Sequence, residues 1–154
     1  MEFHDTNFLY AQQNSRIREG EVVWKPPDSG WYKINTNVAI NKLGKKIGFG
    51  IVIRDATGSV VASSSQSVIA TLSPQVAEAE AILRGLHLAR GLGLLLVTIE
   101  SDAAMVVKWT NKGSHCGADV GLVLDDIVAM SRSLGCGLIS FVPQKANQVV
   151  HFLA

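Results

Sequence analysis

The sequence contains few cysteines and no long hydrophobic run, and both absences narrow the class of protein. Cys116 and Cys136 are the only cysteines among 154 residues, and they lie far apart and outside any metal-binding motif. Small secreted domains usually carry more cysteine, so we expect two free thiols in a reducing compartment. No apolar stretch has the length of a membrane span, and the first residues lack the layout of a signal peptide. We therefore expect a soluble intracellular protein without a membrane partner.

The net charge is also small, because 14 lysines and arginines nearly balance 13 acidic residues. A net charge of +1 argues against nucleic-acid binding by bulk electrostatics alone, although a local basic patch remains open. Hydrophobic residues make up 47% of the chain and charged residues 18%, which excludes disorder of the whole chain. The length suits one domain with a real core.

Residues 75–102 contain the predicted helix and strand around which the other predicted elements are arranged. Residues 75–90 are predicted to form a helix with one apolar face, made by Ala79, Ile82, Leu83, Leu86 and Ala89. Gly91 is expected as its left-handed cap. Residues 94–99 are apolar at almost every position, as in a strand covered on both faces, and Asp102 follows at the carboxyl end where α/β sheets place ligands.

The remaining elements predict an α/β domain. Residues 1–23 are interpreted as a poorly ordered leader, with Trp24 expected to pin the following extended segment to the sheet. The domain itself, residues 24–154, is predicted to contain strands at 31–39, 48–54, 59–69 and 138–142 and helices at 103–112, 120–134 and from 148 onward. The expected fold is a mixed five-stranded sheet, an antiparallel meander of three strands plus two parallel strands, flanked by helices.

Four sequence blocks resemble the ribonuclease H superfamily, in particular the domains of plant proteins and retroelement polyproteins. They are WKPP with GWYKINTN (24–37), GFGIVIRDATG (48–58), AEAEAILRGL with ESD (77–86 and 100–102) and NQVVHFLA (147–154). Their order and spacing match the strands and helices predicted independently. The plant-type resemblance implies a nuclear, cytoplasmic or organellar location.

In that family four carboxylates hold two divalent metals, Mg²⁺ or Mn²⁺, beside the scissile phosphate. The resemblance places these four positions on Asn37, Glu78, Asp102 and His151, so two of the four are not carboxylates. The first position bridges both metals in the family, and an amide oxygen at Asn37 is a neutral ligand. Imidazole at His151 can still ligate some metals or move a proton. Glu78 and Asp102 are therefore the expected metal ligands of a degenerate site, and the metal is Mg²⁺ or Mn²⁺ if one binds at all.

Each of these residues also has a simpler interpretation. Asp102 can be the N-cap of the following helix, and Glu78 can lie on a solvated face or offset the helix dipole in the first turn. His151 can be a packed histidine. Lys42, Lys45 and Lys46 can contact phosphates or form a solvated hairpin tip. Glu80 and Glu100 are interpreted as surface residues.

The expected function is a nucleic-acid-binding domain for RNA–DNA hybrid or structured RNA, derived from a two-metal endoribonuclease and weak or inactive in cleavage. Two alternatives stay open: an active endoribonuclease on RNA–DNA hybrids, and a protein-interaction domain without a nucleic-acid role. A monomer is expected, and a protein partner remains open.

Overall fold

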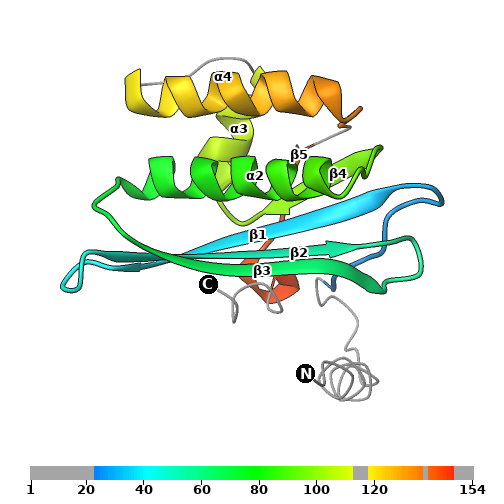
Figure 1. Ribbon diagram of the computed structural model, residues 1–154, viewed down its shortest axis with the longest axis horizontal. Coiled ribbons are helices and arrows are strands. Elements are labelled where there is room, and N and C mark those ends of the chain that lie inside the picture. The colour runs from blue at the N-terminus through cyan, green and yellow to red at the C-terminus, as the bar shows by residue number, and fades with distance from the viewer. Residues whose placement is uncertain (1–22, 113–117, 137–138, 148–154) are drawn as a thin grey trace.

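The computed structural model describes residues 23–112, 118–136 and 139–147 (Figure 1). The predicted leader, apart from Val23, and the predicted helix from residue 148 lie outside the described residues. In chain order the elements are β1 (Tyr32–Asn41), β2 (Lys46–Arg54), β3 (Val60–Ile69), α2 (Pro74–Gly91), β4 (Val97–Ser101), α3 (Ala104–Lys112), α4 (Ala118–Ser133), β5 (Ile139–Phe141) and the short 3₁₀ helix η1 (Gln144–Asn147). This series confirms the predicted order of elements from β1 to β5, whereas η1 was not predicted.

The five described strands form one mixed sheet in the order β3-β2-β1-β4-β5. β1 pairs antiparallel with β2, and β2 pairs antiparallel with β3. β4 runs parallel to β1, and β5 runs parallel to β4. The predicted antiparallel meander joined to two parallel strands is therefore confirmed.

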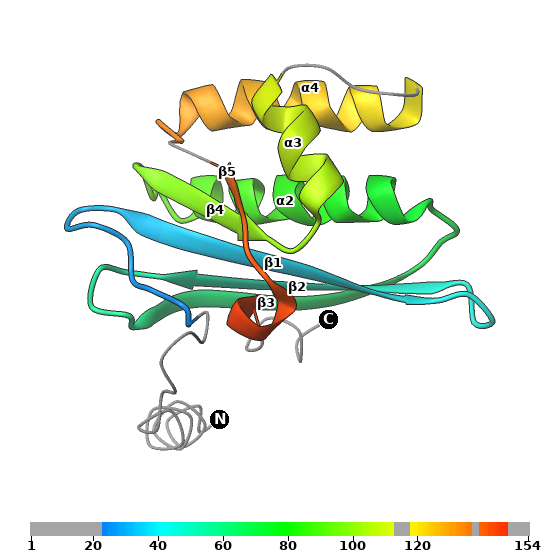
Figure 2. The same cartoon turned by 180° about the vertical axis from the view of Figure 1, so that it is seen from behind.

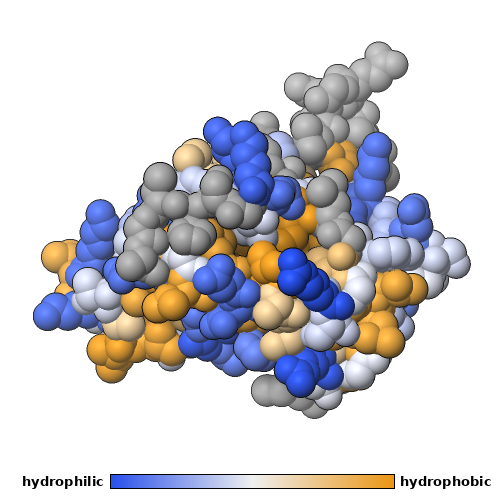
Figure 3. All heavy atoms as spheres, turned by 90° about the horizontal axis from the view of Figure 1, so that it is seen from above, coloured by the Kyte–Doolittle hydropathy of each residue, from blue (hydrophilic) through white to orange (hydrophobic). Residues whose placement is uncertain are grey.

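The described α-helices lie on one side of the sheet, where α2 covers the strands and α4 packs on the far side of α2, whereas η1 lies on the other side (Figures 1 and 2). Alternating side chains of β1 and β2, such as Ile34, Ile51 and Ile53, face the buried face of α2, as the two-residue period of a strand requires. All five residues of the predicted apolar helix face are buried. Gly85 allows the helix to approach β1 closely, because a Cβ there would lie 2.9 Å from Cγ2 of Ile34. Figure 3, viewed from above, shows hydrophilic and hydrophobic side chains interleaved on the outer surface.

Both ends of α2 are capped. The hydroxyl of Ser73 accepts a hydrogen bond from the N–H of Val76, and Pro74 is the first helical residue. At the other end Gly93, with φ of 70°, takes the left-handed position, and the N–H of Leu94 donates to the carbonyl of Ala89. This is a Schellman motif. The prediction of Gly91 as the left-handed residue is wrong, because the helix continues through Gly91.

The strand expected to begin at residue 94 begins at Val97. Leu96 has a left-handed φ of 58°, which interrupts the extended chain just before the strand. Tertiary hydrogen bonds hold this conformation, since Leu96 donates its N–H to Leu134 and accepts from the N–H of Tyr32. Among the described residues, no helix is long and apolar enough to cross a membrane.

Candidate functional site

The register of β1 and β4 brings two of the predicted site residues to neighbouring positions. The two strands run parallel, and their last paired residues are Thr36 and Ser101. Asn37 and Asp102 each follow directly after this pair, at the carboxyl end of β4. Asn37 is buried, with 3% of its surface exposed, and Asp102 is half-buried. An amide and a carboxylate therefore occupy neighbouring positions where β4 ends, and the carboxyl ends of strands are where α/β sheets commonly bind ligands.

Glu78 comes to the same place from α2. Burial, and secondarily the negative charge of Asp102, raises the pKa of Glu78 from its usual 4.5 to about 7. Its Oε2 is buried and receives no hydrogen bond from any described residue. Glu78 is the fifth residue of α2, which leaves the first turn without an acidic residue. The simpler interpretations of Glu78, as a solvated residue or a first-turn dipole partner, are therefore wrong.

The helix predicted to begin directly after Asp102 begins one residue later than expected. α3 begins at Ala104, and the carbonyl of Ala103 accepts the helical hydrogen bond from the N–H of Val107. Ala103 therefore occupies the cap position, with its own N–H bonded to the hydroxyl of Ser101. Asp102 lies one residue before it, at the end of β4.

Beside Asn37, a polar network on the face opposite α2 ties four segments together. Asn35 accepts a hydrogen bond from Nε1 of Trp24 at 2.9 Å, and its amide donates to Glu100 at 3.2 Å and to Asn147 at 3.0 Å. The amide of Asn147 in turn donates to the backbone carbonyl of Thr36 at 2.8 Å. Both asparagines are buried. The network fixes η1 against β1, immediately next to Asn37.

Glu100 belongs to this network and is not the surface residue expected from the sequence. Its carboxylate accepts from Asn35 and lies 3.4 Å from Nζ of Lys33, and both charged side chains are largely buried. The Trp24 ring also contacts the guanidinium of Arg54 at 4.3 Å and the ammonium of Lys33 at 5.4 Å. The prediction that Trp24 pins its segment to the sheet is confirmed. Period-two alternation, which sets Lys33, Asn35 and Asn37 on one face of the strand, was the signal that could have revealed this network.

The three predicted lysines lie at the β1–β2 hairpin, at the end of the molecule where α2 begins (Figures 1 and 2). Lys42 and Lys45 are in the four-residue loop and Lys46 starts β2, and all three are exposed. Lys45 adopts a left-handed φ of 47°, and the N–H of Gly44 donates to the side chain of Asn41. A hollow of about 330 Å³ lies beside this hairpin, lined by Ala39, Ile40, Asn41, Lys46, Gly48 and Ser67.

The fourth predicted site residue, His151, lies outside the described residues. Within the part of the chain that is described, no group of three or more His, Cys, Asp or Glu side chains could hold a metal ion. The described members of the site are thus two carboxylates, Glu78 and Asp102, with the amide of Asn37 next to Asp102.

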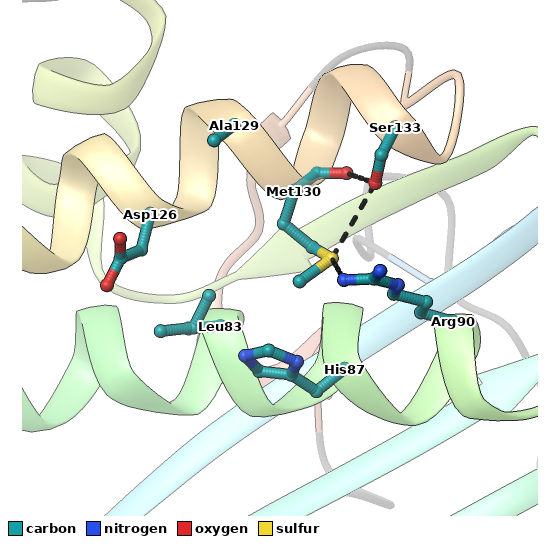
Figure 4. Close-up of a pocket in the computed structure, with 7 residues that line it drawn as sticks. All are labelled: Leu83, His87, Arg90, Asp126, Ala129, Met130 and Ser133. Carbon is teal, nitrogen blue, oxygen red and sulfur yellow. Dashed lines mark hydrogen bonds between the residues drawn. The ribbon is translucent and has the colours of Figure 1, made fainter.

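A second hollow, of about 370 Å³, lies between α2 and α4 and is separate from these residues (Figure 4). Arg90 points a guanidinium nitrogen at the sulfur of Met130, at 3.8 Å, and the hydroxyl of Ser133 donates to the Met130 carbonyl. Leu83 forms an apolar part of the wall, and His87 and Asp126 stand on opposite helices. None of these residues was predicted as part of a site.

Comparison with solved structures identifies the fold. The N-terminal RNase H domain of a Mycobacterium tuberculosis protein superposes with a TM-score of 0.72 and 24% identity, covering 80% of this chain and 90% of that one. RNase H1 from Halobacterium salinarum gives 0.74 and 18%, with coverages of 80% and 94%. LC11-RNase H1, isolated from compost and solved with an RNA/DNA hybrid, gives 0.70 and 19%, with coverages of 79% and 92%. No curated protein sequence matches the chain.

Sequence comparison with family models is more specific. The model described as reverse transcriptase-like matches residues 35–154, which is most of the chain and includes every predicted site residue. This agrees with the ribonuclease H fold of the structural neighbours and with the resemblance read from the four sequence blocks. The chain therefore belongs to the reverse transcriptase-like family of ribonuclease H-like domains.

Proposed function

We propose that this domain binds RNA–DNA hybrid or structured RNA and cleaves it weakly or not at all. The observation that carries the proposal is the buried amide of Asn37, at the position where the family resemblance expects a carboxylate bridging two metals. An amide contributes no negative charge, and its nitrogen cannot face a cation. Loss of a bridging charge is expected to raise the barrier to hydrolysis by several kcal/mol, which corresponds to orders of magnitude in rate.

The two remaining carboxylates fit a single hard cation better than a pair. Oε2 of Glu78 is buried without a donor among the described residues, and the charge of Asp102 lies near enough to raise the Glu78 pKa. These features favour Glu78 and Asp102 as ligands of one Mg²⁺ or Mn²⁺. When bound, such an ion supplies charge neutralisation and activation of water. The protein's own contribution is to hold both carboxylates on rigid elements at one edge of the sheet.

Nucleic-acid binding does not depend on the full metal site, because an RNA-containing duplex can be recognised by its shape, 2′-hydroxyls and phosphates. Two structural neighbours, LC11-RNase H1 and a foamy virus protease–reverse transcriptase, were solved with RNA/DNA hybrids, which supports this ligand class. The exposed lysines of the β1–β2 hairpin, at the end where α2 begins, are proposed as phosphate contacts. A net charge of +1 predicts few such contacts and a modest salt dependence.

The test is fluorescence anisotropy of a labelled RNA–DNA hybrid over a series of salt concentrations, with duplex DNA and duplex RNA as competitors. The variant K42A/K46A leaves the left-handed Lys45 in place and removes two positive charges. We expect it to weaken hybrid binding several-fold and to reduce the slope of log K against log salt by up to about 2. The matched control, R90A/R132A, removes two charges from α2 and α4 on the outer helical side, and its slope should match that of the unmodified chain. Absence of binding at low salt would favour a role in protein interaction instead.

A further inference from the structure

The β3 strand lies at an edge of the sheet. Of the five described strands, only β2 pairs with β3, in regular register from Ala62 to Ile69 and with a bulge at Val61 before the last pair, Arg54 and Val60. The opposite edge is formed by β5, which has three residues. Strands of ten residues at an edge present a long row of backbone donors and acceptors that can pair with another strand.

This edge lacks the charged residues that usually prevent strand pairing. No charged residue occurs anywhere between Asp55 and Glu78, and the ten residues of β3 read VVASSSQSVI, without proline. Two hydrophobic side chains near its ends are exposed, Val61 at 43% and Ile69 at 86%. Edge strands of monomeric proteins are usually protected by a lysine, a proline, an inward-pointing charge or a β-bulge. Of these devices β3 has only the bulge at Val61, near its first residue, so the regular part of the strand, from Ala62 to Ile69, suits a partner strand of the same kind.

The sequence of β3 is self-complementary about Ser65. In an antiparallel pair of two β3 strands centred on this residue, Val61 would face Ile69, Ser63 would face Ser67, and Ser65 would face its own copy. These side chains alternate to the face away from α2, whereas Ala62 and Val68 alternate to the helical face and would face each other there. Both exposed hydrophobic residues would therefore acquire hydrophobic partners, and polar residues would meet polar ones.

We propose that two copies of this chain associate through antiparallel pairing of their β3 strands, with Ser65 on the two-fold axis, to form a continuous ten-stranded sheet. A two-fold axis normal to the sheet gives an isologous interface, in which the same surface serves both copies and the assembly closes at two. A monomer was predicted from the sequence without considering which strand lies at the edge of the sheet.

The described helices do not cover the free edge of β3. α2 packs over β1 and β2, so the helices of two paired copies would be separated by both β3 strands. The guanidinium of Arg84 donates a hydrogen bond to Gln66 of β3 and forms an ion pair with Glu80 at 3.2 Å. The positive charge of Arg84, near the proposed two-fold axis, is therefore balanced within each copy. The candidate site, at the carboxyl end of β4, lies beyond β2 and β1 from the interface. The proposed phosphate contacts are closer to the interface, because Lys46 pairs with Ile69 at one end of β3.

The first test is sedimentation velocity of the full chain over a wide range of concentrations without nucleic acid. The weight-average mass should rise from 16.5 kDa toward twice that value. The variant S63K/S67K sets lysine opposite lysine in both halves of the interface and should remain monomeric at every concentration. In S63K/S67E each lysine would instead face a glutamate of the other copy, and dimerisation should return. Circular dichroism establishes that both variants fold, since both positions are exposed.

The second test examines the register, in a background with both native cysteines replaced by serine. S65C should form an intermolecular disulfide on mild oxidation, because directly opposed residues have Cα atoms within disulfide range. S63C alone should not, because residue 63 would lie opposite residue 67, whereas S63C/S67C should cross-link. A chain that stays monomeric at all concentrations, a dimer that S63K/S67K leaves intact, or cross-linking of S63C equal to that of S65C would each overturn the proposal.

Discussion

At the scale of single residues, the fold changes the protonation of Glu78. Its carboxylate is mostly buried, its Oε2 has no donor among the described residues, and Asp102 adds a nearby negative charge. Each of these conditions disfavours the ionised form. The folded protein therefore holds the Glu78 proton more tightly than the unfolded chain does, and stability must depend on pH through this residue.

We predict that Glu78→Gln stabilises the metal-free protein above pH 7 but not below about pH 4.5. Below pH 4.5 the carboxyl is protonated in both the folded and the unfolded chain. As pH rises from 4.5 through about 7, the unfolded chain loses this proton first, and the stability of the unmodified protein falls. Above pH 7 the variant should be more stable by on the order of 3 kcal/mol. Urea unfolding in chelator at several pH values measures the difference, with Glu80→Gln as the control, and parallel pH profiles for the unmodified chain and Glu78→Gln would contradict the account.

Asn35 is the residue on which the polar network beside Asn37 depends. Asn35→Ala leaves the Trp24 indole and the Asn147 amide without their partner. Because Asn35 and Asn147 are buried, the free energy of unfolding should fall by roughly 2 kcal/mol or more. Asn41→Ala, which removes one hydrogen bond in the exposed hairpin, is the matched control and should lose less than about 1 kcal/mol. Equal losses in the two variants would show that the network adds no stability.

At the scale of elements, α2 is the centre of the domain, because it packs against the sheet on one side and α4 on the other. Its apolar period was sufficient to predict the buried face, since 3.6-residue periodicity is local information. The termini of the neighbouring elements were harder to predict. The start of β4 depends on the left-handed Leu96, which is held by hydrogen bonds to Tyr32 and Leu134, residues distant in the chain. The three leucines at 94–96 therefore looked like strand although they precede it.

Two glycines of α2 provide a matched pair for testing how closely the helix approaches the sheet. Gly85→Ala would place Cβ 2.9 Å from Cγ2 of Ile34 and 3.3 Å from Cγ2 of Thr36, so overpacking should outweigh the gain in helix propensity. We expect a net loss of about 1–2 kcal/mol in unfolding free energy. Gly91→Ala meets nothing within 4 Å in the same helix and should be neutral or stabilising by up to about 1 kcal/mol. Thermal or urea unfolding compares them, and changes of the same sign at both positions would contradict the close packing.

At the scale of the whole molecule, the order of strands and helices along the chain was predictable, because hydrophobic periodicity and turn residues mark each element locally. The mixed character of the sheet was predicted from this order. The candidate site was predictable only through the family resemblance, since Asn37, Glu78 and Asp102 come from three elements that the topology brings together. The network of Trp24, Asn35, Glu100 and Asn147 was not predicted, because its partners are set by the packing of four distant segments. The role of β3 as an edge strand likewise follows from the order of strands in the sheet, which local sequence does not specify.

We propose that the neutral amide of Asn37 limits cleavage by a site whose scaffold is otherwise retained. The most direct test of this proposal is single-turnover cleavage of a labelled RNA–DNA hybrid in Mg²⁺ and in Mn²⁺, by the unmodified chain, Asn37→Asp, and Asn37→Asp with His151→Asp. We predict at most trace cleavage by the unmodified chain and a gain of at least about 100-fold in the doubly restored variant, corresponding to about 3 kcal/mol of barrier. Adding Glu78→Ala to the restored variant should abolish the gain. Cleavage by the unmodified chain at the restored rate, lost on Glu78→Ala alone, would contradict the account and establish an active nuclease that tolerates a neutral ligand.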